Sequence, residues 1–215
     1  MSKMLLHELH PSVVHAPLAL LPTAMIADLI AVTSGDRSWA KVGRRLWVAG
    51  TASALFAGVA GLAASQQVRM REPVARDMVF THGSLNALVT VGAVGLTAWR
   101  LLRRPSRVSC VVALAANGMA LYTATLGGKM VYELGVGINP MPEDAPQGTL
   151  KGPALFSREA PAALFRDALR GIRWLLSRAR SLKDVPFAPG AEGVRDNPPV
   201  LPTEPVSTVS PTVGA

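Results

Sequence analysis

The stretch that decides the fold is LWVAGTASALFAGVAGLAA, residues 46–64, which contains no charged side chain. About 20 apolar residues make a helix long enough to cross a hydrocarbon core about 30 Å thick. Three further apolar runs of similar length lie before residue 130, at 13–32, 79–99 and 108–126. The sequence therefore predicts four membrane-spanning helices.

The composition of the 215-residue chain supports the same interpretation. Charged residues make up 17% of it, against about 25% in ordinary soluble domains, and the mean hydropathy is +0.30. A single cysteine, Cys110, excludes a disulfide framework and a cysteine-based zinc or iron–sulfur site. The first apolar run is too long for a cleavable signal peptide and has no small-residue cleavage pattern.

Positive charge is distributed unevenly between the two ends of the predicted spans. The loops at 33–45 and 100–107 together carry eight Lys and Arg residues, whereas the other side carries five. Short loops rich in Lys and Arg stay in the cytoplasm. We therefore predict a multi-pass protein of the bacterial inner membrane with both termini in the periplasm.

Small residues recur at four-residue spacing in the second span, at Gly50, Ala54 and Gly58. Such residues let helix backbones approach closely, which is how helices pack inside a bilayer. The predicted fold class is thus all-α, an integral membrane antiparallel four-helix bundle over residues 1–138.

The chain changes character after this bundle. Residues 139–158 read as a Pro-rich connector, residues 159–183 as a basic amphipathic helix, and residues 184–215 as an extended or disordered tail. The helix is expected either on an anionic membrane surface or on a partner subunit. Residues 140–215 are the segment expected to bind other membrane protein subunits. Nucleic-acid binding is not expected, because the cations flank membrane spans and no nucleic-acid motif occurs.

Three of the four histidines, His7, His10 and His15, lie near the start of the first span, and His82 lies near the start of the third. In an alternating bundle these two spans begin on the same side, so His15 and His82 are predicted at similar depth. Two imidazoles on facing helices are suitable axial ligands for haem iron. We therefore predict His15 and His82 as iron ligands, with His10 a further cofactor-binding residue. The alternative is that these histidines only cap helices or handle protons.

Asp28 lies about 20 Å along the helix from His15, too far to share a site with it. We expect it to form an ion pair with Arg44, Arg45 or an arginine of the loop at 100–107. Asn86 and Asn117 are expected to form hydrogen bonds between helices and so to help hold the bundle together.

Three motifs resemble those of an uncharacterised family of four-span bacterial membrane proteins, a domain of unknown function. HPSVVHAPLAL at residues 10–20 resembles its opening HPxxVHxPxxL, HGSLN at 82–86 its HxxLN, and GGKMVYELGVG at 127–137 its GGxLVYxxGVG. The resemblance covers about residues 7–139. It implies a four-span fold and an electron-transfer or haem context. Leu134 occupies a position where the family often has histidine.

Two classes of function follow. The first is a redox-accessory membrane protein that binds a b-type haem or faces a quinone at the periplasmic end of the bundle. The second is a cofactor-free structural subunit of a larger membrane complex, anchored by its C-terminal tail. No nucleophile–base triad or carboxylate pair is visible, so we expect no independent catalytic activity.

Overall fold

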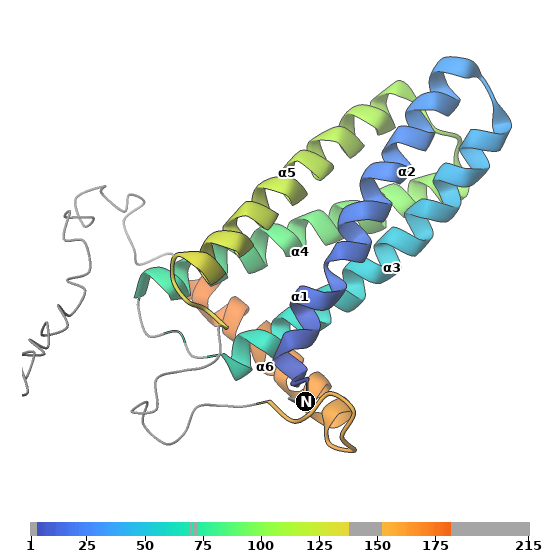
Figure 1. Ribbon diagram of the computed structural model, residues 1–215. Coiled ribbons are helices and arrows are strands. Elements are labelled where there is room, and N and C mark those ends of the chain that lie inside the picture. Colours follow the sequence, from blue (N-terminus) through green and yellow to red (C-terminus); the bar gives the residue numbers. More distant parts are fainter. Residues whose placement is uncertain (1–3, 69, 71–72, 138–151, 182–215) are drawn as a thin grey trace, which may run out of the picture. The chain divides into compact units, whose positions relative to one another are not determined.

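The computed structural model of the chain describes residues 4–68, 70, 73–137 and 152–181. Nearly all of this part is helical. A short 3₁₀ turn, η1 (Leu6–Glu8), leads into α1 (Leu9–Val13) and α2 (His15–Ser34), and the remaining helices are α3 (Arg37–Gln67), α4 (Pro73–Leu102), α5 (Arg107–Tyr132) and α6 (Ala160–Ser181) (Figure 1). The all-α prediction is confirmed.

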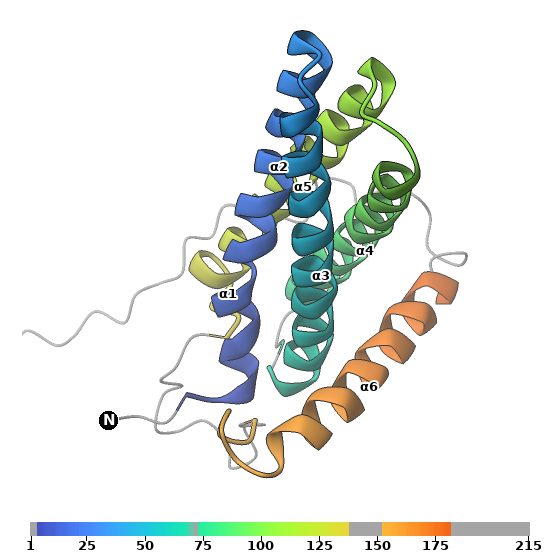
Figure 2. The ribbon, with the colours of Figure 1, turned by 90° about the vertical axis from the view of Figure 1, so that its right-hand side faces the viewer.

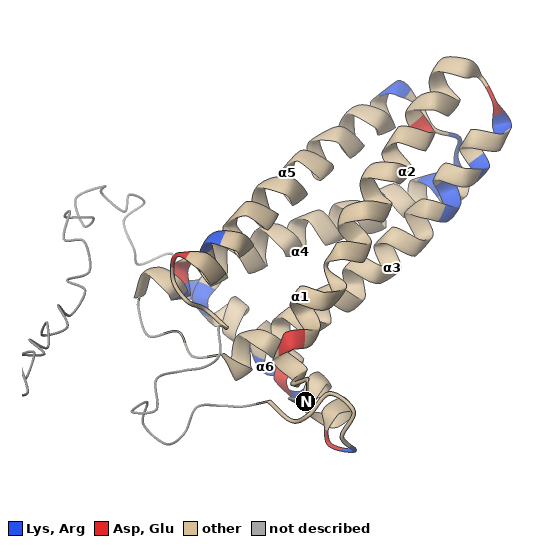
Figure 3. Ribbon diagram, viewed as in Figure 1, with Lys and Arg blue, Asp and Glu red and all other residues tan. Residues whose placement is uncertain are grey.

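Four helical segments of the described chain are long and apolar enough to cross a membrane. They are Leu6–Ser34, which comprises η1, α1 and α2, and then α3, α4 and α5. Each contains one of the four predicted apolar runs. Lys, Arg, Asp and Glu gather toward the ends of these helices, and their central turns are almost free of charge (Figure 3). Because a charge in the hydrocarbon is costly, this distribution is the one expected of membrane spans.

Short capped turns join these helices. Gly35 ends α2 in the left-handed conformation, at φ +72°, which glycine adopts without steric cost. The next residue, Asp36, caps α3 by accepting a hydrogen bond from the backbone N–H of Ser38 at 2.6 Å. Ser106 and Ser109 form a reciprocal cap at the start of α5. The capped turns send consecutive helices in opposite directions.

The helices pack through small residues. Gly50 of α3 lies so close to α2 that an added Cβ would be 2.7 Å from Cδ2 of Leu21. Along the same helix Ala54, Ala57 and Ala60 are buried. The main core combines residues of four helices: Leu21, Ala24, Trp47, Ala54, Ala93, Leu96 and Ala113. Close backbone approach gives dispersion contacts, which drive helix association inside a bilayer.

The outer faces of the same helices are apolar as well. Phe56 of α3, Val91 of α4 and Val111 of α5 are exposed by 47%, 68% and 67%. A soluble protein rarely exposes so much contiguous apolar surface. These side chains therefore face the acyl chains of a bilayer, which confirms that the protein contacts lipid.

The segment that precedes α6 is held by the N-terminus. Leu6 donates its N–H to the carbonyl of Pro153 at 2.9 Å, and Leu155 donates to the carbonyl of Met4 at 2.8 Å. Helix α6 then lies beside the end of α3 (Figure 2). The predicted C-terminal amphipathic helix is present as α6, and residues 182–183 of the predicted range 159–183 lie outside the described residues. Most of the predicted connector at 139–158, and all of the predicted tail at 184–215, lie outside the described residues. The division of the chain after residue 138 stays a prediction.

Candidate functional site

Two histidines meet inside the bundle. His10 of α1 and His82 of α4 have ring centroids 6.4 Å apart, and their ring planes are nearly perpendicular, at 85°. Both side chains are partly buried. The contact joins the start of the first span to the start of the third.

The ring of His10 is oriented by α3. Its Nδ1 lies 3.0 Å from the carbonyl oxygen of Ala57. A carbonyl only accepts, so Nδ1 carries the proton and Nε2 of the neutral ring carries the lone pair. Gly61, one turn further along α3, makes room for the ring, because a Cβ there would lie 2.9 Å from Nδ1 and from Cε1.

The ring of His82 is oriented in the same way by α5. Its Nδ1 donates to the carbonyl oxygen of Thr123 at 2.9 Å. The side-chain amide of Asn86 donates to Nε2 of His82 at 3.1 Å, while its oxygen accepts from the hydroxyl of Thr123 at 3.0 Å. Gly127 packs against this ring, where a Cβ would lie 3.2 Å from Cε1. Each contact requires the tautomer with Nδ1 protonated, so the network fixes both rings and both tautomers.

The other two histidines lie elsewhere. His15, at the start of α2, is exposed, whereas His7 is buried and its Nδ1 has no hydrogen-bond partner in the described part of the chain. The structure thus brings His82 together with His10, and the pairing of His15 with His82 as iron ligands stays a prediction. Within residues 4–68, 70, 73–137 and 152–181, no group of three or more His, Cys, Asp or Glu side chains is arranged to hold a metal ion.

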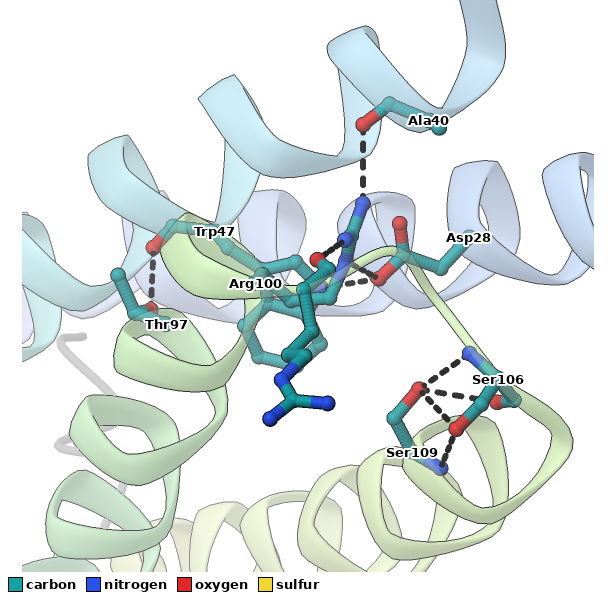
Figure 4. A network of polar contacts seen from close by, with 8 residues as sticks. Asp28, Ala40, Trp47, Thr97, Arg100, Ser106 and Ser109 are labelled. Atoms are coloured by element: carbon teal, nitrogen blue, oxygen red, sulfur yellow. Dashed lines mark hydrogen bonds and ion pairs between the residues drawn. The ribbon is translucent and has the colours of Figure 1, made fainter. Parts of the chain in front are cut away.

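A second polar cluster surrounds Asp28, about 27 Å along the helix from His10. Arg100 donates from Nε to Oδ2 of Asp28 at 2.7 Å, and Trp47 donates from Nε1 to the same oxygen at 2.8 Å (Figure 4). Asp28 and Arg100 are each 3% exposed. Arg100 also donates to the carbonyls of Ala40 and Arg103, at 2.9 Å and 2.6 Å. The cluster therefore joins α2, α3 and α4.

This cluster confirms that Asp28 forms an ion pair with an arginine from 100–107. The other oxygen, Oδ1, is buried without a hydrogen-bond partner in the described structure and packs against Gly43, where a Cβ would overlap it. Sequence reasoning did not identify Trp47 as a partner. The sequence did contain a signal for this contact, because an indole N–H buried in a span needs a hydrogen-bond acceptor.

The two asparagines differ. Asn86 bonds across to Thr123 of α5, as predicted. Asn117 instead donates to the carbonyl of Ala113, four residues earlier in its own helix, at 2.8 Å. An amide in a helix can always reach the carbonyl one turn back, so sequence alone does not settle which bond forms.

These features define a four-span helical integral membrane protein with a histidine pair toward one end of the bundle and a buried ion pair toward the other. The chain belongs to the predicted membrane protein family DUF2231, whose model matches residues 6–140. Helix α6 lies outside the matched residues. No curated protein and no solved structure matches the chain.

Proposed function

We propose that this protein is a redox-accessory membrane protein that binds a b-type haem through His10 and His82. The observation that carries the proposal is the pair of neighbouring imidazoles, whose ring centroids are 6.4 Å apart and each of which is oriented by a backbone carbonyl. The two imidazoles come from different helices, α1 and α4, and each would offer one nitrogen to a haem iron held between them.

The hydrogen bonds of the two rings support the same role. A histidine that binds a metal through one nitrogen commonly donates its other N–H to a carbonyl or carboxylate, which fixes the ring and raises its basicity. Here Ala57 and Thr123 supply those carbonyls. No hydrogen bond to Nε2 of His10 occurs within the described structure, while Nε2 of His82 accepts from Asn86 and would exchange that bond for iron.

Bound haem would supply reversible one-electron transfer. The protein would hold the iron between α1 and α4, orient both imidazoles through their Nδ1–H bonds, and surround the site with apolar helices. If the pair instead faces a quinone, the same Nε2 lone pairs would accept hydrogen bonds from the quinol hydroxyls. We propose that this end of the bundle faces the periplasm of a bacterial inner membrane, because the opposite loops hold the denser positive charge.

A cofactor-free structural subunit of a larger membrane complex is the alternative. It is favoured by the same hydrogen bonds, since His10 joins α1 to α3 and the network of His82, Asn86 and Thr123 joins α4 to α5. Such bonds stabilise helix association in bilayers without any ligand. In this role the histidines would serve the fold alone.

The difference spectrum of the purified full-length protein, dithionite-reduced minus oxidised, tests the proposal. Wild type should show the α-band of a b-type haem. His10→Ala and His82→Ala should each abolish this α-band, although both variants should still insert into the membrane and purify as monodisperse protein. His15→Ala, at an exposed position, is the matched control and should retain the band. Loss on His15→Ala with retention on His10→Ala would reassign the ligand to His15. Wild type without haem, after expression with added haem precursor, would overturn the proposal in favour of the structural subunit.

A further inference from the structure

Helix α6 docks on the bundle along one face. Gln67, the last residue of α3, donates to Oδ2 of Asp167 at 2.9 Å. Gly171 lies against the backbone of α3, where a Cβ would be 2.5 Å from the carbonyl oxygen of Leu62. Trp174 packs edge-on against Phe80 of α4, with ring centroids 6.3 Å apart. These docking residues fall within an arc of about 60° on α6, at about 100° per residue.

A second apolar face of α6 has no protein cover in the described structure. It consists of Phe165, Leu169, Ile172 and Leu176, which are 65%, 57%, 42% and 54% exposed. Their spacing of four, three and four residues places them in one stripe, about 160° around the helix from the docking face. We call these four residues the outer stripe. An apolar stripe of this kind rarely remains in water.

Arginines occupy one of the two flanks between these faces. Arg166, Arg170, Arg173 and Arg180 lie between the docking face and the outer stripe on one side of the helix. The opposite flank is apolar and includes Leu164, Ala168 and Leu175. Going round the helix, the order is docking face, apolar flank, outer stripe and arginine flank. This is the pattern of a helix that lies in a membrane interface with its charged side toward the headgroups.

The docking contacts place α6 at the end of the bundle where α3 ends and α4 begins. Gln67 is the last residue of α3. Gly83 of α4 also contacts α6, since a Cβ there would lie 3.4 Å from Cδ2 of Leu175, and both Phe80 and Gly83 lie about two to three turns into α4. These positions lie close to the ends of the apolar runs at 46–64 and 79–99, where a span of that length is expected to leave the hydrocarbon.

We propose that α6 is a binding surface for anionic phospholipids of the bilayer that the bundle spans. The outer stripe inserts among the acyl chains, and the arginine flank binds the phosphate groups. Arginine suits this role because its planar guanidinium forms paired hydrogen bonds with phosphate oxygens. Arginines near an anionic membrane surface are also attracted by its potential. The assignment goes beyond the proposed redox role and does not depend on it.

Site-directed spin labelling of the full-length protein tests this placement. Cys110 is replaced by Ala, and a nitroxide is attached at Ile172→Cys in the outer stripe or at Ser177→Cys, an exposed position in the arc of the arginine flank. Each protein is placed in nanodiscs of phosphatidylcholine with or without phosphatidylglycerol. Power saturation then compares accessibility to oxygen, which concentrates in lipid, with accessibility to a water-soluble nickel chelate.

With phosphatidylglycerol, the label at 172 should be reached by oxygen and protected from nickel, and the label at 177 should show the reverse. Without it, or with Arg173 and Arg180 both changed to Gln, nickel accessibility at 172 should rise severalfold; Arg166 and Arg170 are kept because they pair with Asp167 of the docking face. Nickel access at 172 in both lipids would overturn membrane insertion. Exclusion of both reagents would indicate a protein partner or a second copy and overturn the lipid assignment. Equal lipid depth in both nanodiscs would overturn the recognition of anionic headgroups.

Discussion

The ion pair between Asp28 and Arg100 offers the sharpest test of what holds the bundle together. Replacing Asp28 by Ala leaves the guanidinium of Arg100 at 3% exposure without its counter-charge and removes the acceptor of the Trp47 indole. Breaking a buried pair on one side costs about 3–5 kcal/mol. For a chain of this size, about 2–4 °C is lost per kcal/mol, so we expect the Tm in detergent to fall by about 6–20 °C.

Two companion variants separate charge from packing. Asp28→Asn keeps a hydrogen-bond acceptor for Trp47 but removes the charge, and it should lie between wild type and Asp28→Ala. The double variant Asp28→Ala, Arg100→Met removes both charges and should recover most of the loss, because an apolar replacement of a buried pair is often nearly neutral. The measurement is thermal unfolding followed by the fluorescence of the tryptophans and by size exclusion. If Asp28→Ala unfolds within 1 °C of wild type, or if the double variant is no more stable than the single one, the reasoning is refuted.

Three further predictions concern the packing around Asp28, the docking of α6 and the topology of the loops. Gly43→Ala should lower the Tm despite the better helix propensity of Ala, because the added Cβ overlaps Oδ1 of Asp28. The matched control Gly58→Ala, which has no atom near the added Cβ, should be neutral or slightly stabilising. An unchanged Tm of Gly43→Ala would show that the side chain of Asp28 moves freely. Burial would raise the pKa of Asp167, but the hydrogen bonds from Gln67 and Arg166 and the charges of Arg166 and Arg170 hold that pKa below its ordinary value. The docking of α6 should therefore weaken as the pH falls below about 4, where Asp167 begins to take up a proton. Hydrogen exchange of α6 measures this weakening, and Asp167→Asn should remove its pH dependence. Cysteines introduced at Ser38 and Arg104, in a Cys110→Ala background, should resist an impermeant reagent applied from the periplasm, and labelling of both would reverse the assigned topology.

The sequence alone predicted the helices well, because length and hydropathy constrain a membrane span strongly. Each apolar run became one helix, and Gly35 and Asp36 marked a turn that glycine conformation and side-chain capping require. The sequence also predicted an arginine partner for Asp28, because a buried carboxylate needs a cation at the same depth. It left Arg44, Arg45 and the arginines of 100–107 as alternatives, of which the structure selects Arg100. The basic helix near the C-terminus followed from its 3.6-residue period.

The histidine pair shows where sequence reasoning ended. Depth along a helix can be counted, and it placed His10, His15 and His82 toward one end of the bundle. The direction in which each side chain points depends on how the helices rotate against one another, and small residues set that rotation. Gly61 and Gly127 admit the rings of His10 and His82. Only the tertiary structure could therefore pair these two and leave His15 exposed.

The same distinction holds for α6. Its amphipathic pattern determined that it has an apolar side, because the residues on one face of a helix follow from sequence spacing. The pattern did not determine that Asp167 and Gly171 dock on the end of α3 while Phe165 and Leu169 stay exposed. Hydropathy treats all apolar residues alike, whereas docking depends on where a glycine allows backbone contact and where a buried carboxylate finds a donor. The sequence thus determined the helices and the depth of their polar groups, and the close packing of specific side chains decided which of those groups meet.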